Sequence, residues 1–94
     1  MKALEGKTAF VTGGSTGIGL GMARVFARAG MNVVITDIRD EALTSAQQIL
    51  AEITDNVLAL NVDSTDLAAL ERAADEIERT FGALHVLCNN AGVP

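Results

Sequence analysis

The sequence predicts an α/β fold in which a doubly wound parallel sheet carries helices on both faces. Short, nearly continuous apolar runs alternate with longer segments of helical periodicity, in the order β-α-β-α-β-α-β. Such runs are typical of strands that are covered on both faces. Helical connections of this length imply parallel neighbours joined by right-handed crossovers. We therefore expect four strands in the order 3-2-1-4, with the first two helices on one face of the sheet and the third on the other.

Four apolar runs define the expected strands. They are TAFVT at 8–12, NVVITD at 32–37, NVLALNV at 56–62 and LHVLCN at 84–89. Three helices are expected between them, at 17–29, 40–53 and 66–81, and Gly30 and Gly82 provide the stops of the first and third. Ser64 or Thr65 can cap the third helix, and Asp66 is an alternative cap. Cys88, inside the fourth run, is expected to pack in the core.

Each expected helix has an apolar stripe that should face the sheet. The stripes are Ile18, Met22, Val25, Phe26 and Ala29 in the first helix, Leu43, Ala46, Leu50 and Ile53 in the second, and Leu67, Leu70, Ala74, Ile77 and Phe81 in the third.

Composition and charge describe a small folded domain and argue against several partners. The 94 residues are 49% hydrophobic and 20% charged, as is typical of one globular domain. The 12 acidic residues outnumber the seven scattered basic ones, for a net charge of −5, which disfavours a nucleic-acid partner. There is no polybasic segment, and no apolar run of about 18 residues, to indicate a membrane partner. The single cysteine excludes an internal disulfide, and we expect a cytoplasmic protein.

Three spaced glycines lie between the first strand and the first helix, in TGGSTGIG at 12–19. The N-terminus of a helix presents unpaired N–H groups and a partial positive charge, so a pyrophosphate can bind there if nothing blocks its approach. Gly13 lets the chain turn after the strand, Gly17 has no Cβ to collide with phosphates, and Gly19 lets the helix pack close to the strand. These glycines predict a phosphate-binding loop.

The residues between the glycines can add hydrogen-bond donors to this loop. Ser15 and Thr16 carry hydroxyl groups, and the backbone N–H of Ile18 can point at a phosphate. The alternative is a glycine-rich turn that binds nothing, although the succession of strand, loop and helix favours the nucleotide. The sequence lacks GK[ST], which excludes a P-loop NTPase.

Polar residues also follow the second, third and fourth expected strands. Asp37 ends the second strand, where a carboxylate can accept from both hydroxyls of an adenosine ribose and repel a 2′-phosphate. Asp63 and Ser64 end the third strand, where a carboxylate could accept from the adenine amino group. Asp37 could instead be a solvated residue or a helix cap, and Asp63 a helix cap. The fourth strand ends in NNAG at 89–92, which alone could be an ordinary loop.

Together these motifs resemble those of the short-chain dehydrogenase/reductase family. TGGSTGIG resembles its TGxxxGIG motif, NNAG its second fingerprint, and DSTD at 63–66 its adenine-binding segment. The resemblance covers the whole chain and implies a Rossmann-type fold. It also implies roles for individual residues: Gly13, Gly17, Ile18 and Gly19 at the pyrophosphate, Asp37 at the ribose, Asp63 and Ser64 at the adenine, and Asn90, Ala91 and Gly92 along the ribose and nicotinamide side. Asn89 would mainly brace the sheet.

The resemblance implies NAD rather than NADP as the cofactor. In the family, a preference for NADP usually accompanies a basic residue just before the second motif glycine or just after the position of Asp37. Thr16 and Ile38 stand at those positions here, although Arg39 follows one residue later. The implied reaction is hydride transfer between the nicotinamide and a small-molecule carbonyl or alcohol substrate. A homo-oligomeric full-length enzyme is also implied.

The family's catalytic residues have no counterpart in this sequence. They are a Ser, a Tyr and a Lys four residues after the Tyr, whereas this chain has no tyrosine and has lysines only at positions 2 and 7. We therefore expect residues 1–94 to be the cofactor-binding segment of a longer dehydrogenase, with no catalytic residue and no metal site of its own. His85 stands where the family commonly has Asp, and we expect a surface residue there. Two alternatives are a dinucleotide-binding sensor without catalysis and a methyltransferase, which the GxxxGxG spacing and NNAG disfavour.

Overall fold

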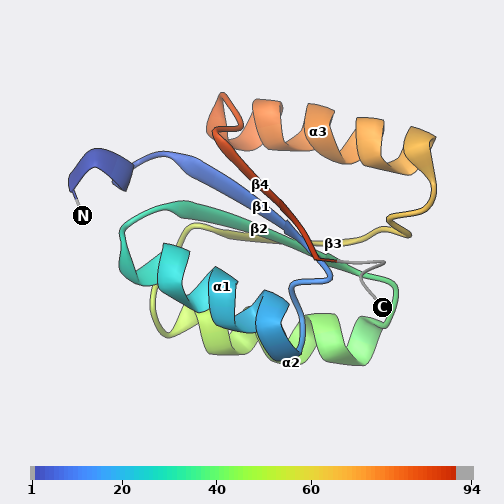
Figure 1. Ribbon diagram of the computed structural model, residues 1–94, viewed down its shortest axis with the longest axis horizontal. Coiled ribbons are helices and arrows are strands. Elements are labelled where there is room, and N and C mark those ends of the chain that lie inside the picture. The colour runs from blue at the N-terminus through green and yellow to red at the C-terminus, as the bar shows by residue number, and fades with distance from the viewer. Residues whose placement is uncertain (1, 91–94) are drawn as a thin grey trace.

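The computed structural model describes residues 2–90, which form a four-stranded parallel sheet with helices on both faces (Figure 1). The sheet order is β3-β2-β1-β4, and all three neighbouring pairs are parallel. The predicted fold class and strand order are therefore confirmed. The strands are β1 (Thr8–Thr12), β2 (Asn32–Asp37), β3 (Val57–Asn61) and β4 (Val86–Asn89), and the helices are η1 (Lys2–Leu4), α1 (Gly17–Arg28), α2 (Asp40–Ala51) and α3 (Leu67–Phe81).

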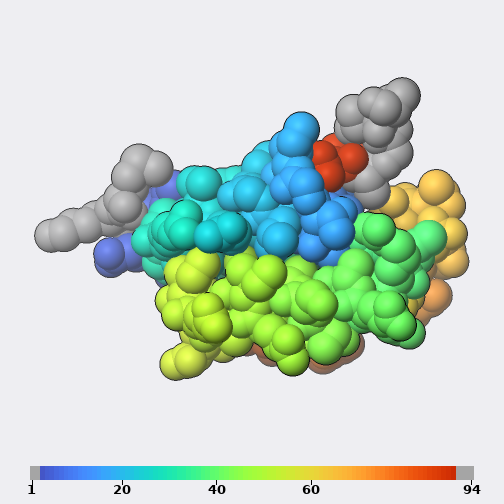
Figure 2. Space-filling view, turned by 90° about the horizontal axis from the view of Figure 1, so that it is seen from below, coloured from blue at the N-terminus to red at the C-terminus, as the bar shows by residue number. Residues whose placement is uncertain are grey.

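Alternation along the central strands separates two apolar cores. On one face, α1 and α2 cover β1 and β2, with Val11 and Ile35 fully buried between them. On the other face, α3 covers Phe10 and Val34 with Ala73 and Ile77. Successive side chains of a strand point to opposite faces, so neighbouring residues of β1 and β2 supply both cores. Figure 1 shows α1 and α2 on one side of the sheet and α3 on the other, and Figure 2 views the face that α1 and α2 cover.

The predicted face of α1 is wrong at two positions. Ile18 is 76% exposed and Val25 is 61% exposed, while Gly19, Ala23 and Ala27 are the buried residues of the helix. These three residues are four apart, so they form one line along the helix, and their small size lets the backbone of α1 lie close to the sheet. The hydrophobic pattern misplaced the face because it gave large apolar residues more weight than small ones.

The other two helices agree better with their predicted faces. Leu43, Ala46 and Leu50 of α2 are buried as predicted, but α2 ends at Ala51 and Ile53 lies beyond it. On α3, Ile77 is buried as predicted. The other buried residue of this helix is Ala73, which was not in the predicted stripe, and Leu67, which was, is 70% exposed.

The cap of α3 is one of the alternatives that the sequence predicts. Asp66 is the N-cap, and its carboxylate accepts a hydrogen bond of 3.1 Å from the backbone N–H of Ala69. Asp66, rather than Ser64 or Thr65, is therefore the capping residue. An ionised carboxylate satisfies an N-terminal donor and also interacts favourably with the positive end of the helix dipole.

Candidate nucleotide-binding site

The glycine loop connects the end of β1 to the start of α1, and two of its glycines adopt a left-handed backbone. Gly13 has φ +64° and Gly17 has φ +56°, a conformation that favours glycine over other residues. A Cβ built on Gly17 would meet no atom within 4 Å, so packing does not explain the glycine there. Gly17 therefore leaves the approach to the N-terminus of α1 open.

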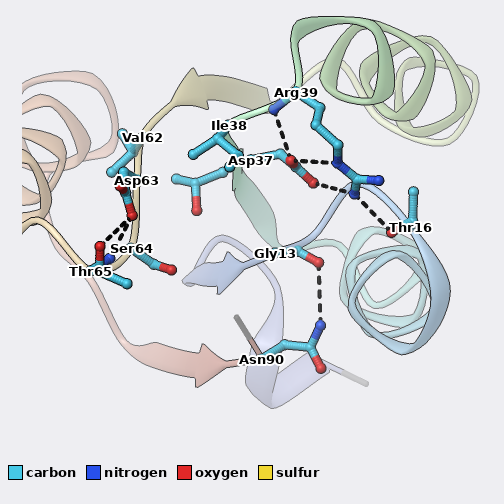
Figure 3. A pocket seen from close by; sticks show the side chains of 11 residues that line it. Gly13, Thr16, Asp37, Ile38, Arg39, Val62, Asp63, Ser64, Thr65 and Asn90 are labelled. Atoms are coloured by element: carbon cyan, nitrogen blue, oxygen red, sulfur yellow. Dashed lines mark hydrogen bonds and ion pairs between the residues drawn. The ribbon is translucent and has the colours of Figure 1, made fainter. Parts of the chain in front are cut away.

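Gly19 and Asn90 pack against the same carbonyl group of the loop. A Cβ on Gly19 would strike the Gly13 carbonyl oxygen and lie 2.8 Å from Asn90 Nδ2. Asn90 Nδ2 in turn donates to that Gly13 oxygen at 3.3 Å (Figure 3). The absence of a side chain at Gly19 thus permits the contact between α1, the loop and the end of β4.

Gly14 is a structural residue of the loop that the sequence reasoning missed. Its backbone N–H donates to the Thr36 carbonyl at 3.1 Å, and an added Cβ would lie 2.6 Å from Ile35 Cγ2 and 3.0 Å from the Val11 carbonyl oxygen. The loop is therefore pressed onto β2 at this point. The GG doublet at 13–14 is the sequence feature that indicates a close approach at Gly14, whereas the motif spacing includes only Gly13, Gly17 and Gly19.

The N-terminus of α1 has the properties of an anion site. Thr16 is its N-cap residue, yet the side chain makes no capping hydrogen bond, and the first turn contains no acidic residue. Ser15 is only 4% exposed, and its hydroxyl faces the Asp37 carboxylate, whose pKa it helps to lower. The first N–H groups of a helix lack intrahelical partners. A bound phosphate would satisfy them.

A cavity of about 370 Å³ lies at the carboxyl ends of the strands, beside this loop. Six predicted site residues line it together: Gly13, Thr16, Asp37, Asp63, Ser64 and Asn90. Figure 3 shows them converging from the glycine loop and from the ends of β2, β3 and β4. Ser15, Gly17, Ile18 and Gly19 belong to the adjoining loop and the first turn of α1. Ala91 and Gly92 lie outside the described residues.

Five further residues line the cavity that the sequence did not single out as ligands. They are Thr36, Ile38, Arg39, Val62 and Thr65. Thr36 is 1% exposed, and within the described chain its hydroxyl has no hydrogen-bond partner. Ile38 is 63% exposed and offers an apolar surface at the cavity. Thr65 belongs to the DSTD segment, and Ile38 and Arg39 occupy positions that bear on cofactor preference, whereas no sequence motif marks Thr36 or Val62.

Asp37 is bound by Arg39 rather than exposed to solvent. The residue is 8% exposed, and its Oδ1 accepts from the backbone N–H of Arg39 at 2.9 Å and from Arg39 Nε at 3.1 Å. Its Oδ2 accepts from Arg39 Nη2 at 3.0 Å. The Arg39 guanidinium lowers the pKa of Asp37 to about 2, against the opposing effect of burial. Asp37 is therefore a carboxylate at neutral pH.

Asp63 forms a tight local turn at the opposite side of the cavity. Its Oδ1 accepts from the Thr65 hydroxyl at 2.7 Å and from the Thr65 backbone N–H at 2.9 Å. These hydrogen bonds lower the pKa of Asp63 below its usual value. Because Asp66 caps α3, Asp63 is not needed for capping, and it is one of the residues that line the cavity.

The end of β4 is tied to β1 through one threonine. Thr12 Oγ1 donates to Asn89 Oδ1 at 2.9 Å and accepts from the Asn90 backbone N–H at 3.1 Å. Asn89 therefore braces the sheet, as the family resemblance implied. Thr12 also positions Asn90 beneath the glycine loop.

His85 has a structural role that the sequence reasoning did not anticipate. Its Nδ1 accepts from the Thr8 backbone N–H at 3.0 Å, and its own backbone N–H donates to the Thr8 carbonyl at 3.0 Å. Although the residue is exposed, it closes the β1–β4 ladder at the amino end of the strands. The cavity lies at the other end of the same strands.

The described part of the chain holds neither a cluster of metal-ligating side chains nor a helix that could cross a membrane. Within residues 2–90, no three His, Cys, Asp or Glu side chains gather closely enough to hold a metal ion. None of the helices described there has the length and apolarity that a membrane crossing requires.

The fold and motifs match those of known proteins. The family model for short chain dehydrogenases matches residues 7–94, and the chain belongs to this family. This chain is 42% identical over 94 residues to a C alpha-dehydrogenase of Sphingobium sp., and the alignment covers 99% of this chain and 31% of that protein.

Solved structures agree with this assignment. The apo form of LigO from Sphingobium sp. strain SYK-6 superposes with a TM-score of 0.91 at 48% identity, covering 99% of this chain and 35% of that one. L-Sorbose reductase from Gluconobacter frateurii, in complex with NADPH and L-sorbose, gives a TM-score of 0.88 at 32% identity over 95% of this chain and 34% of that one. The chain thus spans about a third of the length of these relatives.

Proposed function

We propose that residues 1–94 are the cofactor-binding segment of an NAD-dependent oxidoreductase that interconverts small-molecule alcohols and carbonyl compounds. One observation carries this proposal: a single cavity brings together the glycine loop, the carboxylate at the end of β2 and the carboxylate at the end of β3. These groups match, in order, the phosphate, ribose and adenine parts of a dinucleotide. Membership of the short-chain dehydrogenase family supports the same reaction class.

The residues present fit the phosphates of such a cofactor. The open space at Gly17 and the acid-free first turn of α1 both suit an anion. We assign Gly13, Gly17, Ile18 and Gly19 to the pyrophosphate, through backbone N–H groups and the absence of blocking side chains. Ser15 and Thr16 add hydroxyl donors.

The strand ends would hold the rest of the dinucleotide. We assign Asp37 to the adenosine ribose, where its ionised carboxylate can accept from hydroxyl groups. Asp63 and Ser64 are assigned to the adenine, and Asn90, Ala91 and Gly92 to the ribose and nicotinamide side. When bound, the nicotinamide ring supplies or accepts a hydride.

No residue of this chain is assigned to proton transfer. The chain has no tyrosine, and its only histidine is fixed at the amino end of the sheet by Thr8. We place the proton donor in polypeptide outside residues 1–94. The chain's own task is then to bind and orient the cofactor, and the substrate of the whole enzyme would be set elsewhere.

The first test is binding of the cofactor to the protein. NADH should bind saturably in a fluorescence titration, and Asp37→Ala should weaken the binding of NAD by about tenfold because charge-assisted hydrogen bonds to ribose are lost. The matched control is Asp55→Ala, which removes an exposed carboxylate at the amino end of β3 and should leave the affinity unchanged. Equal weakening by both substitutions, or no binding of NADH, would refute the assignment.

The second measurement separates binding from catalysis. The 94-residue protein should not oxidise NADH when it is mixed with a panel of ketones and aldehydes, since a positioned acid contributes about 10²–10⁴-fold to such a step. Saturable turnover would show that the proton donor lies within these residues after all. Binding of S-adenosylmethionine in preference to NADH would instead favour a methyltransferase.

A further inference from the structure

Thr36 carries a buried hydroxyl that has no hydrogen-bond partner in the described part of the chain. The residue is 1% exposed, and within residues 2–90 its Oγ1 neither donates nor accepts a hydrogen bond. A buried polar group in this state lowers the stability of the fold, and most such groups in native proteins are paired. Thr36 also lines the cavity, so a ligand bound there could supply the missing partner.

Alternation along β2 turns the Thr36 side chain away from the Asp37 carboxylate. Successive side chains of a strand point to opposite faces of the sheet. Ile35 belongs to the core under α1 and α2, and Asp37 lies on that same face, whereas Val34 belongs to the core under α3. Thr36 therefore lies on the α3 face and reaches a different part of the cavity from Asp37.

On the α3 face, Thr36 borders the end of β3. It pairs in register with Leu60, and Val62 packs against the same apolar core. Val62 then lines the cavity together with Asp63 and Ser64, and Figure 3 shows these residues on the side of the cavity opposite Arg39. Because Asp63 and Ser64 are assigned to the adenine, the base is the part of the nucleotide that Thr36 would meet.

An adenine at this position needs a hydrogen-bond donor as well as an acceptor. Its amino group donates, but its ring nitrogens accept, and a carboxylate such as Asp63 can serve only the amino group. The neighbouring hydroxyls of Thr65 and Thr12 already donate, to Asp63 Oδ1 and to Asn89 Oδ1 respectively. The Thr36 hydroxyl keeps its proton available, and its small exposed area admits a single approaching atom.

We propose that Thr36 is an adenine-binding residue whose hydroxyl donates a hydrogen bond to a ring nitrogen of the base. Folding has already removed this hydroxyl from water, so binding gains a hydrogen bond without a further desolvation cost at Thr36. The half-buried Ser64 would first have to lose water. This inference rests on the proposed function, because it assumes that the base lies at the end of β3.

The test replaces Thr36 by two residues of similar size. Thr36→Val removes the hydroxyl and keeps the shape of the side chain, and Thr36→Ser keeps the hydroxyl. Thr8→Val is the matched control, since Thr8 is a fully buried threonine at the amino end of β1, away from the cavity, and its Oγ1 accepts from Asn32 Nδ2 at 3.1 Å. Titration calorimetry gives the affinity of each protein for AMP, and urea unfolding gives its midpoint.

The two valine variants should show opposite patterns. Thr36→Val should bind AMP about five- to tenfold more weakly, while its urea midpoint stays the same or rises because an unpaired buried hydroxyl has been removed. Thr8→Val should lower the midpoint, because it removes a paired hydroxyl, and should leave the affinity for AMP unchanged. Thr36→Ser should keep most of the affinity. A lower midpoint with unchanged AMP binding in Thr36→Val would assign the hydroxyl to the fold alone and overturn the proposal.

Analogues of AMP identify the group that the hydroxyl meets. In each deaza analogue one ring nitrogen of the adenine is replaced by C–H, and one of these analogues should bind the wild-type protein about five- to tenfold more weakly than AMP. Thr36→Val should bind that analogue and AMP equally, because the two changes remove the same hydrogen bond. Equal binding of AMP and all the deaza analogues by the wild type would refute the contact with the base, while the proposed function would stand. If AMP itself does not bind the wild type, the proposed function is wrong and this inference falls with it.

Discussion

Substitution of Gly19 by alanine tests the packing of α1 against the glycine loop. The added Cβ would strike the Gly13 carbonyl oxygen, lie 3.0 Å from the Gly13 carbonyl carbon and lie 2.8 Å from Asn90 Nδ2. Backbone atoms cannot move aside as the end of a flexible side chain can, so the loop or the helix must shift. Overpacking of this kind costs about 1–3 kcal/mol in free energy of unfolding.

Gly21 provides a matched control on the same helix. It is exposed, and a Cβ built on it would meet nothing within 4 Å. Gly21→Ala should therefore stabilise the protein by roughly 0.5–1 kcal/mol, since alanine is the better helix former. The two variants should differ by about 1.5–4 kcal/mol in unfolding free energy. For a domain of this size that corresponds to roughly 6 °C or more in melting temperature.

The assay is urea and thermal unfolding of the wild-type protein and both variants, followed by far-ultraviolet circular dichroism at one protein concentration. Gly19→Ala should melt below the wild type and Gly21→Ala slightly above it. NADH titrations of the folded variants should show weaker binding for Gly19→Ala alone. Equal stability of the two alanine variants would show that α1 does not approach the loop closely enough for Gly19 to matter.

Two further predictions concern Asp37 and the edge of the sheet. Asp37→Asn should lower the unfolding free energy by roughly 1 kcal/mol near pH 7 through loss of the Arg39 ion pair. Folding lowers the pKa of Asp37 from 3.8 to about 2, so its contribution is complete above about pH 4 and is lost as the pH falls toward 2. Urea midpoints of the two proteins should converge over that interval, and a constant gap would contradict the ion pair. Separately, Leu87 is 60% exposed on β4, which in the described chain pairs only with β1. Because such edges recruit other chains, the protein should self-associate in sedimentation velocity, and Leu87→Lys should reduce the association; a monodisperse wild type would refute this.

The sheet was predictable because its order depends on features that a sequence displays directly. The runs at 8–12 and 32–37 match β1 and β2 residue for residue, since both are central strands that are buried along their length apart from the half-buried Asn32. The run at 84–89 begins before β4, which starts at Val86. His85 contacts β1 only through the hydrogen bonds of its backbone and side chain with Thr8, so it is not counted in the strand. Apolar runs thus predict the buried strands of a sheet well, but they predict the ends of an edge strand poorly.

The helices show a similar limit. The hydrophobic pattern located α1 but placed Ile18 and Val25 on its inner face, although both are exposed. The inner face is instead made of Gly19, Ala23 and Ala27, whose small size lets α1 lie close to the sheet. Gly14 escaped notice for a related reason, since its requirement is a close approach to Ile35 that only the folded sheet creates.

The sequence predicts which residues line the candidate site, but it does not predict that Arg39 pairs with Asp37 and offsets its charge. Asp37 and Arg39 are two positions apart, and in an extended strand their side chains would leave the same face in parallel. Here β2 ends at Asp37, and Arg39 begins α2 as its N-cap, so the change in backbone direction turns the guanidinium back onto the carboxylate. A sequence motif that includes Asp37 alone therefore overlooks the guanidinium that offsets its negative charge. Arg39 can pair with Asp37 because β2 ends at Asp37, so the net charge at this point of the cavity depends on where the strand ends.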